Sequence, residues 1–185
     1  MKERKYKEDY SFETYMDEKG REKRKVVYRG DWFRLDADVR KRALVQSSAT
    51  FLLFAAVYLF YLKLNTPGAR CMYVLPIAAC AVVPAVYWAM GLLSLTRLQD
   101  QITRLQKENG IGRVLRSSLG CGILMAVACL GDIVLLLSST QELRGAEFPG
   151  FLLLCLGAAS ALGCFLRIRD VYNGIRKTLP ASSGS

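Results

Sequence analysis

The sequence predicts an all-α integral membrane protein with four transmembrane helices arranged as two helical hairpins. Four long apolar runs follow residue 42, and they cover residues 43–64, 71–95, 117–138 and 148–166. Each run has about 19–25 residues, and a helix that rises 1.5 Å per residue crosses a hydrocarbon core of roughly 30 Å at that length. Basic residues lie almost entirely in those polar segments that four membrane crossings would place on the same side of the membrane. Length, apolarity and charge asymmetry therefore indicate the same class.

The distribution of positive charge predicts the orientation in the membrane. Of the 26 Lys and Arg residues, 23 lie in residues 1–42, in residues 96–116 or after residue 166. The opposite connections hold only Lys63, Arg70 and Arg144. Because basic segments stay in the cytosol during insertion, we expect both termini in the cytoplasm and the chain in the cell membrane. The net charge of +10 then reflects topology and attraction to lipid headgroups, so the lipid bilayer is the expected partner and nucleic acid is not.

Residues 1–42 form a basic cytosolic segment. Apolar and polar residues alternate at Phe12, Thr14 and Met16, and a second extended stretch includes Val27 and Tyr28. Residues 17–20 separate the two stretches with a turn-forming composition, which predicts a β-hairpin. A disordered basic segment is the alternative, because an isolated hairpin is marginally stable in water.

The end of this segment predicts an interfacial anchor. Trp32 and Phe33 precede a basic cluster of Arg40, Lys41 and Arg42. Aromatic rings of this kind lie at headgroup level, and basic side chains beside them contact lipid phosphates.

The first hairpin unit spans residues 43–108 and carries an aromatic stripe. Phe51, Phe54, Tyr58 and Tyr61 recur at heptad spacing, which places them on one helix face. We interpret this stripe as packing within the bundle, and a docking face for another membrane protein is the alternative.

The second apolar run contains Pro76 and Pro84, which predict kinks. Apolar residues then recur beyond the run, and Asn109-Gly110 would end a helix. We therefore expect the second helix to continue into the cytosol and to dock on the N-terminal hairpin or a second copy. The recurring residues are Leu95, Leu98, Ile102 and Leu105.

The second hairpin unit spans residues 113–178. Its last run contains pairs of small residues four apart, which allow helices to approach closely within the monomer or in a homo-oligomer. These pairs are Gly157 with Ala161, Ala159 with Gly163 and Ser160 with Cys164. A shift of 70 residues aligns the ends of both units at an R-[LI]-x-D motif, which suggests a tandem duplication. Residues 179–185 form a tail whose Ser-Ser-Gly-Ser end resembles an engineered linker.

Asp132 is a carboxylate inside the third apolar run. On a helix it shares a face with small and polar residues, so it should point into the bundle. We expect it to pair with Lys63, with Tyr58 and Tyr61 as further hydrogen-bond donors. Proton or cation handling and exposure to the outer solution are the alternatives, since a charged group within a membrane is a functional candidate.

The composition argues against most catalytic classes. The chain has no His, and its six Cys form no CxxC motif. No Walker loop, GxSxG or HExxH motif is present. We therefore predict no metal, no cofactor and no enzyme. The leading expectation is a non-catalytic subunit that oligomerises or joins a larger membrane complex. The alternatives are a small oligomeric channel or transporter built around Asp132, and, less favoured, a lipid-modifying membrane enzyme.

Overall fold

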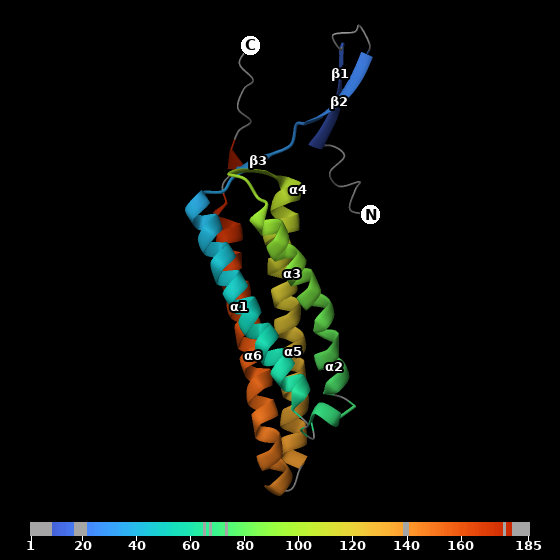
Figure 1. The fold of residues 1–185 in the computed structure, drawn as a ribbon, viewed down its shortest axis with the longest axis vertical. Helices are drawn as coiled ribbons and strands as arrows, with labels where there is room; N and C mark the ends of the chain where they lie inside the picture. The colour runs from blue at the N-terminus through green and yellow to red at the C-terminus, as the bar shows by residue number, and fades with distance from the viewer. Residues whose placement is uncertain are drawn as a thin grey trace.

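The chain folds into a bundle of long helices, as the computed structural model in Figure 1 shows. The structure describes residues 9–16, 22–64, 66, 68–72, 74–138, 141–175 and 177–178. Within these residues, four helical segments are long and apolar enough to cross a membrane, which confirms the predicted number. The segments are Ala37–Lys63, Leu75–Thr96, Arg104–Ser138 and Glu147–Gly174.

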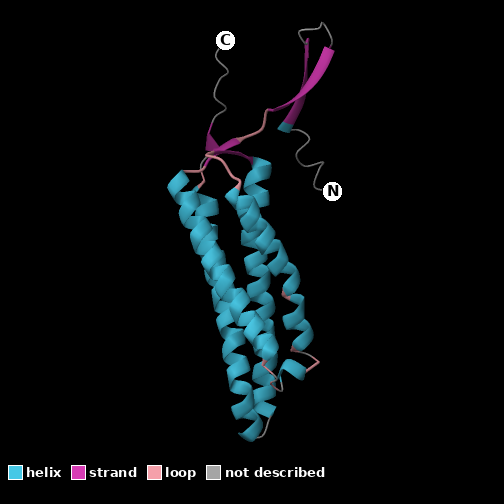
Figure 2. Cartoon of the chain, in the orientation of Figure 1, coloured by secondary structure: helices cyan, strands magenta, loops and turns pink. Residues whose placement is uncertain are grey.

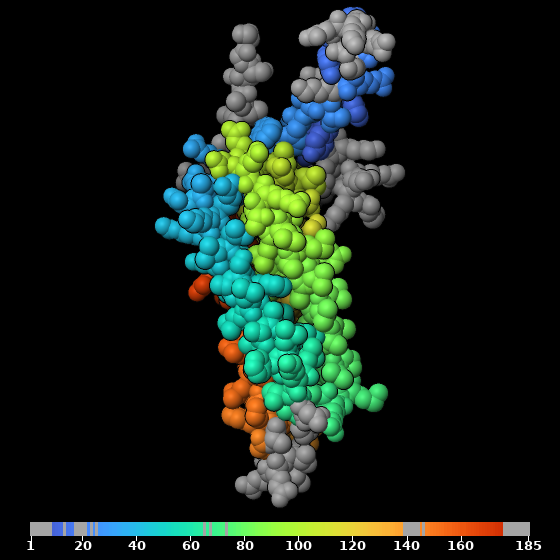
Figure 3. All heavy atoms as spheres, viewed as in Figure 1, coloured from blue at the N-terminus to red at the C-terminus, as the bar shows by residue number. Residues whose placement is uncertain are grey.

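The second hairpin holds the bundle together. Helices α5 (Arg113–Ser138) and α6 (Gln141–Gly174) pack closely on each other. Helix α1 (Ala37–Lys63) packs mainly on α6, and α3 (Val82–Thr96) packs on α5. Contact between α1 and α3 is slight, although both lie on the face drawn in Figure 3. The two units are therefore packed differently, and the tandem duplication stays a prediction.

The kink predicted from Pro84 takes the form of a break at Ala81, which separates α2 (Leu75–Cys80) from α3. Proline has no N–H to donate to the carbonyl four residues earlier, so the helical ladder is interrupted. Side chains of neighbouring helices add contacts beside the break. The Tyr58 hydroxyl donates to the Ala78 carbonyl at 3.1 Å, and the Cys121 thiol lies 3.8 Å from the Ala81 carbonyl. Both carbonyls also accept a backbone N–H, from Ala81 and Ala85 respectively, so these side chains join the break to α1 and α5.

Aromatic side chains fill the centre of the bundle. Trp88 on α3 is fully buried, and its ring lies 5.3 Å from Phe51 and 5.7 Å from Phe54 of α1. Phe54 and Tyr61 are also buried, whereas Phe51 is half-buried. Most of the aromatic stripe therefore faces the interior of the monomer.

A small sheet closes the end of the bundle beside the hairpin of β1 and β2, which we call the terminal end (Figure 2). Strand β3 (Trp32–Arg34) pairs with β4 (Gln101–Thr103) on one side and β5 (Lys177–Thr178) on the other, both antiparallel. The strands come from the three basic segments. These segments therefore lie at the same end of the bundle, and we call the opposite end the distal end.

The second long helix does not continue into the middle loop as predicted. Helix α3 ends at Thr96, and the chain forms β4 before α4 (Arg104–Lys107) and a π-helical turn, η3 (Glu108–Gly112), lead into α5. Thr103 starts the new helix with a capping box, because its hydroxyl accepts from Gln106 N at 3.3 Å and its own N–H donates to Gln106 Oε1 at 2.9 Å. Ile102 is therefore buried as a residue of β4, Leu98 is buried in the segment between α3 and β4, and Leu105 is half-buried on α4.

The aromatic part of the predicted interfacial anchor is wrong for Phe33. Phe33 is only 7% exposed, because β3 is the central strand of the sheet, and the Lys107 ammonium lies 4.7 Å from its ring centroid. Trp32 is half-buried, and its ring packs edge-on against Tyr28 at 5.3 Å. Phe33 therefore belongs to the core at this end of the protein, and the position of Trp32 relative to headgroups stays a prediction.

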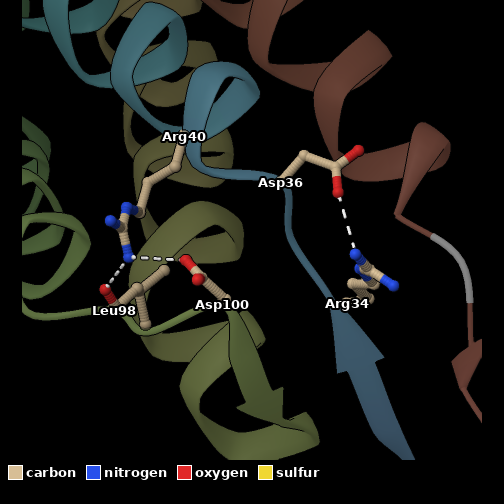
Figure 4. Close-up of polar contacts among 5 residues, drawn as sticks. All are labelled: Arg34, Asp36, Arg40, Leu98 and Asp100. Atoms are coloured by element: carbon tan, nitrogen blue, oxygen red, sulfur yellow. Dashed lines mark hydrogen bonds and ion pairs between the residues drawn. The ribbon is translucent and has the colours of Figure 1, made fainter.

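The basic part of the anchor is divided between two roles. Arg40 donates from Nη1 to the Leu98 carbonyl and lies 3.5 Å from the Asp100 carboxylate, so it joins α1 to the middle loop (Figure 4). Lys41 and Arg42 are exposed. Of the three predicted cations, only these two remain available to headgroups.

The predicted N-terminal hairpin is confirmed. Strands β1 (Tyr10–Met16) and β2 (Glu22–Tyr28) pair antiparallel with Phe12 opposite Val26, and the predicted turn at residues 17–20 lies outside the described residues. Tyr28 anchors the base of the hairpin, because its hydroxyl donates to the Asp31 carbonyl at 2.9 Å and accepts from Arg104 N at 3.2 Å. Burial raises the pKa of Tyr28, so the hydroxyl stays protonated and able to donate up to alkaline pH.

Candidate functional site

Two carboxyl groups meet in the interior of the distal end. Asp132 of α5 is fully buried, and Glu147 of α6 is only 1% exposed. Asp132 lies six residues before the end of α5, and Glu147 lies six residues after the start of α6. Residues equidistant from the turn of an antiparallel helical hairpin face each other across it, so the hairpin itself brings the two acids together.

The connection between α1 and α2 covers this acidic pair. Its short helix η2 (Gly68–Arg70) places Gly68 directly over the acids, and Gly68 N donates to Glu147 Oε2 at 2.6 Å. A β-carbon added at Gly68 would lie 2.3 Å from Glu147 Oε1 and 2.5 Å from Asp132 Oδ1, so these oxygens are within about 5 Å of each other. A side chain therefore fits at this position only if the carboxylates shift.

The remaining polar atoms of the site lack hydrogen-bond partners. Both Asp132 oxygens and Glu147 Oε1 are buried without one, and so is the hydroxyl of Tyr61. Tyr61 is fully buried and close enough to interact electrostatically with both acids. Thr66 borders the site as well, since a β-carbon added at Gly150 would lie 3.1 Å from both Thr66 Oγ1 and Glu147 Oε1. Four buried oxygens in this site therefore have no hydrogen-bond partner, which is rare in a folded protein.

The predicted partner of Asp132 is wrong. Lys63 is exposed at the end of α1, and no ion pair within the described part of the chain joins it to Asp132. Tyr58 is not a donor to Asp132 either, because its hydroxyl is bonded to the Ala78 carbonyl at the helix break. The neighbour of Asp132 is a second acid, Glu147.

Sequence reasoning missed Glu147 because it lies one residue before the apolar run that begins at Phe148. The structure extends α6 back to Gln141, so Glu147 lies inside the hairpin and not in an outer loop. The sequence does contain a signal, because only nine residues separate the two runs and such a short connection forces the helices to continue toward each other.

The small-residue pairs of α6 point in two directions. A β-carbon added at Gly157 would lie 2.7 Å from Met125 Cε, and Ala161 is fully buried, so this pair packs within the monomer. A β-carbon added at Gly163 would meet nothing within 4 Å, and Ala159 is exposed. The Ala159 and Gly163 pair therefore faces away from the described part of the bundle.

The chemistry of the site suits a proton. Two carboxylates within about 5 Å repel by about 3 kcal/mol at an effective dielectric constant of 20. Among the described residues, no ion pair joins either acid to a cationic side chain. One proton held between two such acids removes this repulsion and supplies a donor for the unsatisfied oxygens. No group of three His, Cys, Asp or Glu suited to a metal ion occurs in the part of the chain that the structure describes.

Comparison of the chain with protein-family models, with curated proteins and with solved structures finds no match.

Replacing Gly68 with alanine is expected to displace the cover of the acidic pair and to lower the free energy of unfolding by about 1–3 kcal/mol. The added β-carbon overlaps both carboxylate groups, so these side chains must shift within a buried site. Thermal unfolding in detergent measures the loss. Gly163→Ala is the matched control, since its β-carbon meets nothing within 4 Å. Equal stability of the two variants would show that the cover does not press on the acids.

Proposed function

We propose that this chain is a non-catalytic, four-pass subunit of the cell membrane that holds one exchangeable proton between Asp132 and Glu147. The observation that carries the proposal is the pair of buried carboxyl groups with unsatisfied oxygens, which no ion pair among the described residues joins to a cation. A buried acidic pair without a counter-ion is costly in a membrane unless a proton or cation joins it. The protein would thereby respond to the pH on one side of the membrane.

The charge distribution supports an outward-facing position for the acidic pair. The sheet of β3, β4 and β5 gathers the three basic segments at the terminal end. Segments rich in Lys and Arg stay in the cytosol, so the terminal end would be cytoplasmic and the distal end would face outward. The proton would then exchange with the outer solution past the cover that η2 forms over the acids.

The composition of the interior favours binding over conduction. The buried residues of α5 between Asp132 and the terminal end include Ala128, Met125 and Cys121, which offer a proton no carboxylate or amide. Asp132 is also buried inside the monomer and does not face a neighbouring copy. An oligomeric channel around Asp132, the alternative expectation, would need it on an outer face.

A proton is favoured over a metal ion because the site is small and tightly covered. The Gly68 backbone lies against both acids, and its N–H already donates a hydrogen bond to Glu147 Oε2. Among the described residues, Tyr61 and Cys129 are titratable groups that interact with the pair. A phenol and a thiol are both neutral near pH 7, so the described part of the site takes its charge from the two acids.

Potentiometric titration of the solubilised protein tests the proposal. The wild-type chain is expected to bind one more proton near pH 7 than the D132N/E147Q variant, which has neutral side chains of the same shape. Equal proton binding by the two proteins would mean that both acids are ionised and would overturn the proposal. Release of the extra proton on addition of Na⁺ or Ca²⁺ would also overturn it, since a cation would then be the ligand.

The N-terminal hairpin supports the further proposal that the subunit assembles with another membrane protein or a second copy. Phe12 and Met16 are each 73% exposed, and Val26, opposite Phe12, is 55% exposed. Three apolar side chains are therefore exposed on one hairpin face, beside Thr14, Arg24 and Glu22. Exposed apolar patches commonly mark interaction sites. Crosslinking from a photoreactive residue at position 12 in intact membranes is expected to trap a partner, and crosslinks to lipid alone would contradict it.

A further inference from the structure

A cleft of about 300 Å³ lies near the terminal end, on the outer surface between α3 and the start of α5. Its wall on α3 is apolar, and its opposite wall comes from α4, η3 and α5 and carries the charged groups. The lining residues are Val83, Pro84, Tyr87, Leu105, Glu108, Asn109, Arg113, Arg116 and Ser117. This volume is at the lower end of the range for small-molecule sites.

Polarity changes along the length of the cleft. Arg113 and Arg116 lie in the first turn of α5, at the terminal end. Pro84 lies deeper, because it packs at the level of Gly120, where an added β-carbon would be 3.3 Å from the proline ring. A helical rise of 1.5 Å per residue puts Gly120 about 10 Å below Arg113. The cleft is thus cationic near the membrane surface and apolar toward the membrane centre.

The arginines are arranged to accept an anion. Arg116 Nη2 lies 3.4 Å from Glu108 Oε2 and forms an ion pair with it. Arg113 Nη2 lies 3.5 Å from Asn109 Oδ1, and a hydrogen bond of this length is weak. Glu108 neutralises only one of the two guanidinium groups, so the cleft keeps a net positive charge. Guanidinium groups bind phosphate oxygens through paired N–H donors.

We propose that this cleft binds one phospholipid with an anionic headgroup, with the phosphate at Arg113 and Arg116 and an acyl chain along Val83 and Pro84. Val83 is 62% exposed and Tyr87 is 53% exposed, so the cleft opens toward the bilayer. One end of the cleft is cationic and the other end is apolar, which matches an amphiphile and not a soluble anion. The inference depends on membrane insertion and is independent of the acidic pair at the distal end.

Native mass spectrometry of the detergent-purified chain with added phosphatidylglycerol tests the site. One lipid is expected to remain bound, and R113Q/R116Q is expected to bind it about tenfold more weakly, because each basic group near an anionic headgroup contributes to affinity. R97Q/R169Q is the matched control, since both arginines are exposed and outside the cleft. An equal loss in the control would overturn the proposal.

A second pair of variants tests the apolar half of the cleft without changing charge. Val83→Trp would fill the acyl position and is expected to weaken phosphatidylglycerol binding, whereas Val86→Trp, at an exposed position outside the cleft, is expected to bind normally. Normal binding by Val83→Trp would overturn the proposal, even if R113Q/R116Q fails to fold. Equal retention of phosphatidylcholine, or displacement of the lipid by glycerol phosphate, would also overturn it.

Discussion

The D132N/E147Q variant is expected to keep its stability at alkaline pH, where the wild-type chain loses about 3 kcal/mol of its free energy of unfolding. In the wild-type chain, removal of the shared proton leaves two carboxylates within about 5 Å in a buried site. Their repulsion acts only in the folded state, so stability falls as the pH rises. The amides of the variant carry no charge and cannot repel.

Thermal unfolding in detergent between about pH 5 and about pH 9 measures this difference. Groups elsewhere in the chain titrate equally in both proteins, so the divergence of the two curves isolates the pair. Asp170→Asn is the matched control, because Asp170 is an exposed carboxylate at the terminal end. It is expected to follow the wild-type curve. Parallel curves for the wild type and D132N/E147Q would contradict the shared proton.

Replacing Trp88 with alanine is expected to lower the free energy of unfolding by about 3–5 kcal/mol. Trp88 is fully buried and packs against Phe51 and Phe54, so its removal leaves a cavity at the contact of α1 with α3. Helices α1 and α3 make few other contacts with each other. Trp88 Nε1 has no hydrogen-bond partner, so the substitution measures packing and not a lost hydrogen bond.

Denaturation of the purified chain in detergent gives the size of this effect. Met90→Ala on the same helix is the control, since Met90 is 46% exposed on the surface of the bundle. It is expected to lose far less stability than Trp88→Ala. A similar loss in both variants would mean that Trp88 faces lipid and that the aromatic stripe does not pack inside the bundle.

The membrane-spanning helices could be predicted from the sequence because their signal is strong and local. Twenty or so apolar residues allow few structures other than a helix in lipid, since every backbone group must be bonded within the segment. The same local pattern misled in the middle loop. Leu98 and Ile102 have helical spacing, yet Ile102 lies on β4 because residues distant in sequence supply its neighbours, β3 above all.

The candidate site was predictable in part. Asp132 was recognised from its contrast with the apolar residues around it, and its inward direction followed from the small residues on its face. Glu147 was not, because a carboxylate at the boundary of an apolar run resembles a loop residue. The role of Gly68 could not be predicted at all, since it depends on how the connection folds over the two acids.

The infrared spectrum of the protein in membranes tests the shared proton most directly, because a protonated carboxyl group has a carbonyl band that a carboxylate lacks. The wild-type chain is expected to show this band for one buried acid per chain at neutral pH, shifted in D₂O, and to lose it in D132N/E147Q. If the wild-type spectrum at neutral pH has no such band, or if the band persists in the variant, Asp132 and Glu147 do not share a proton.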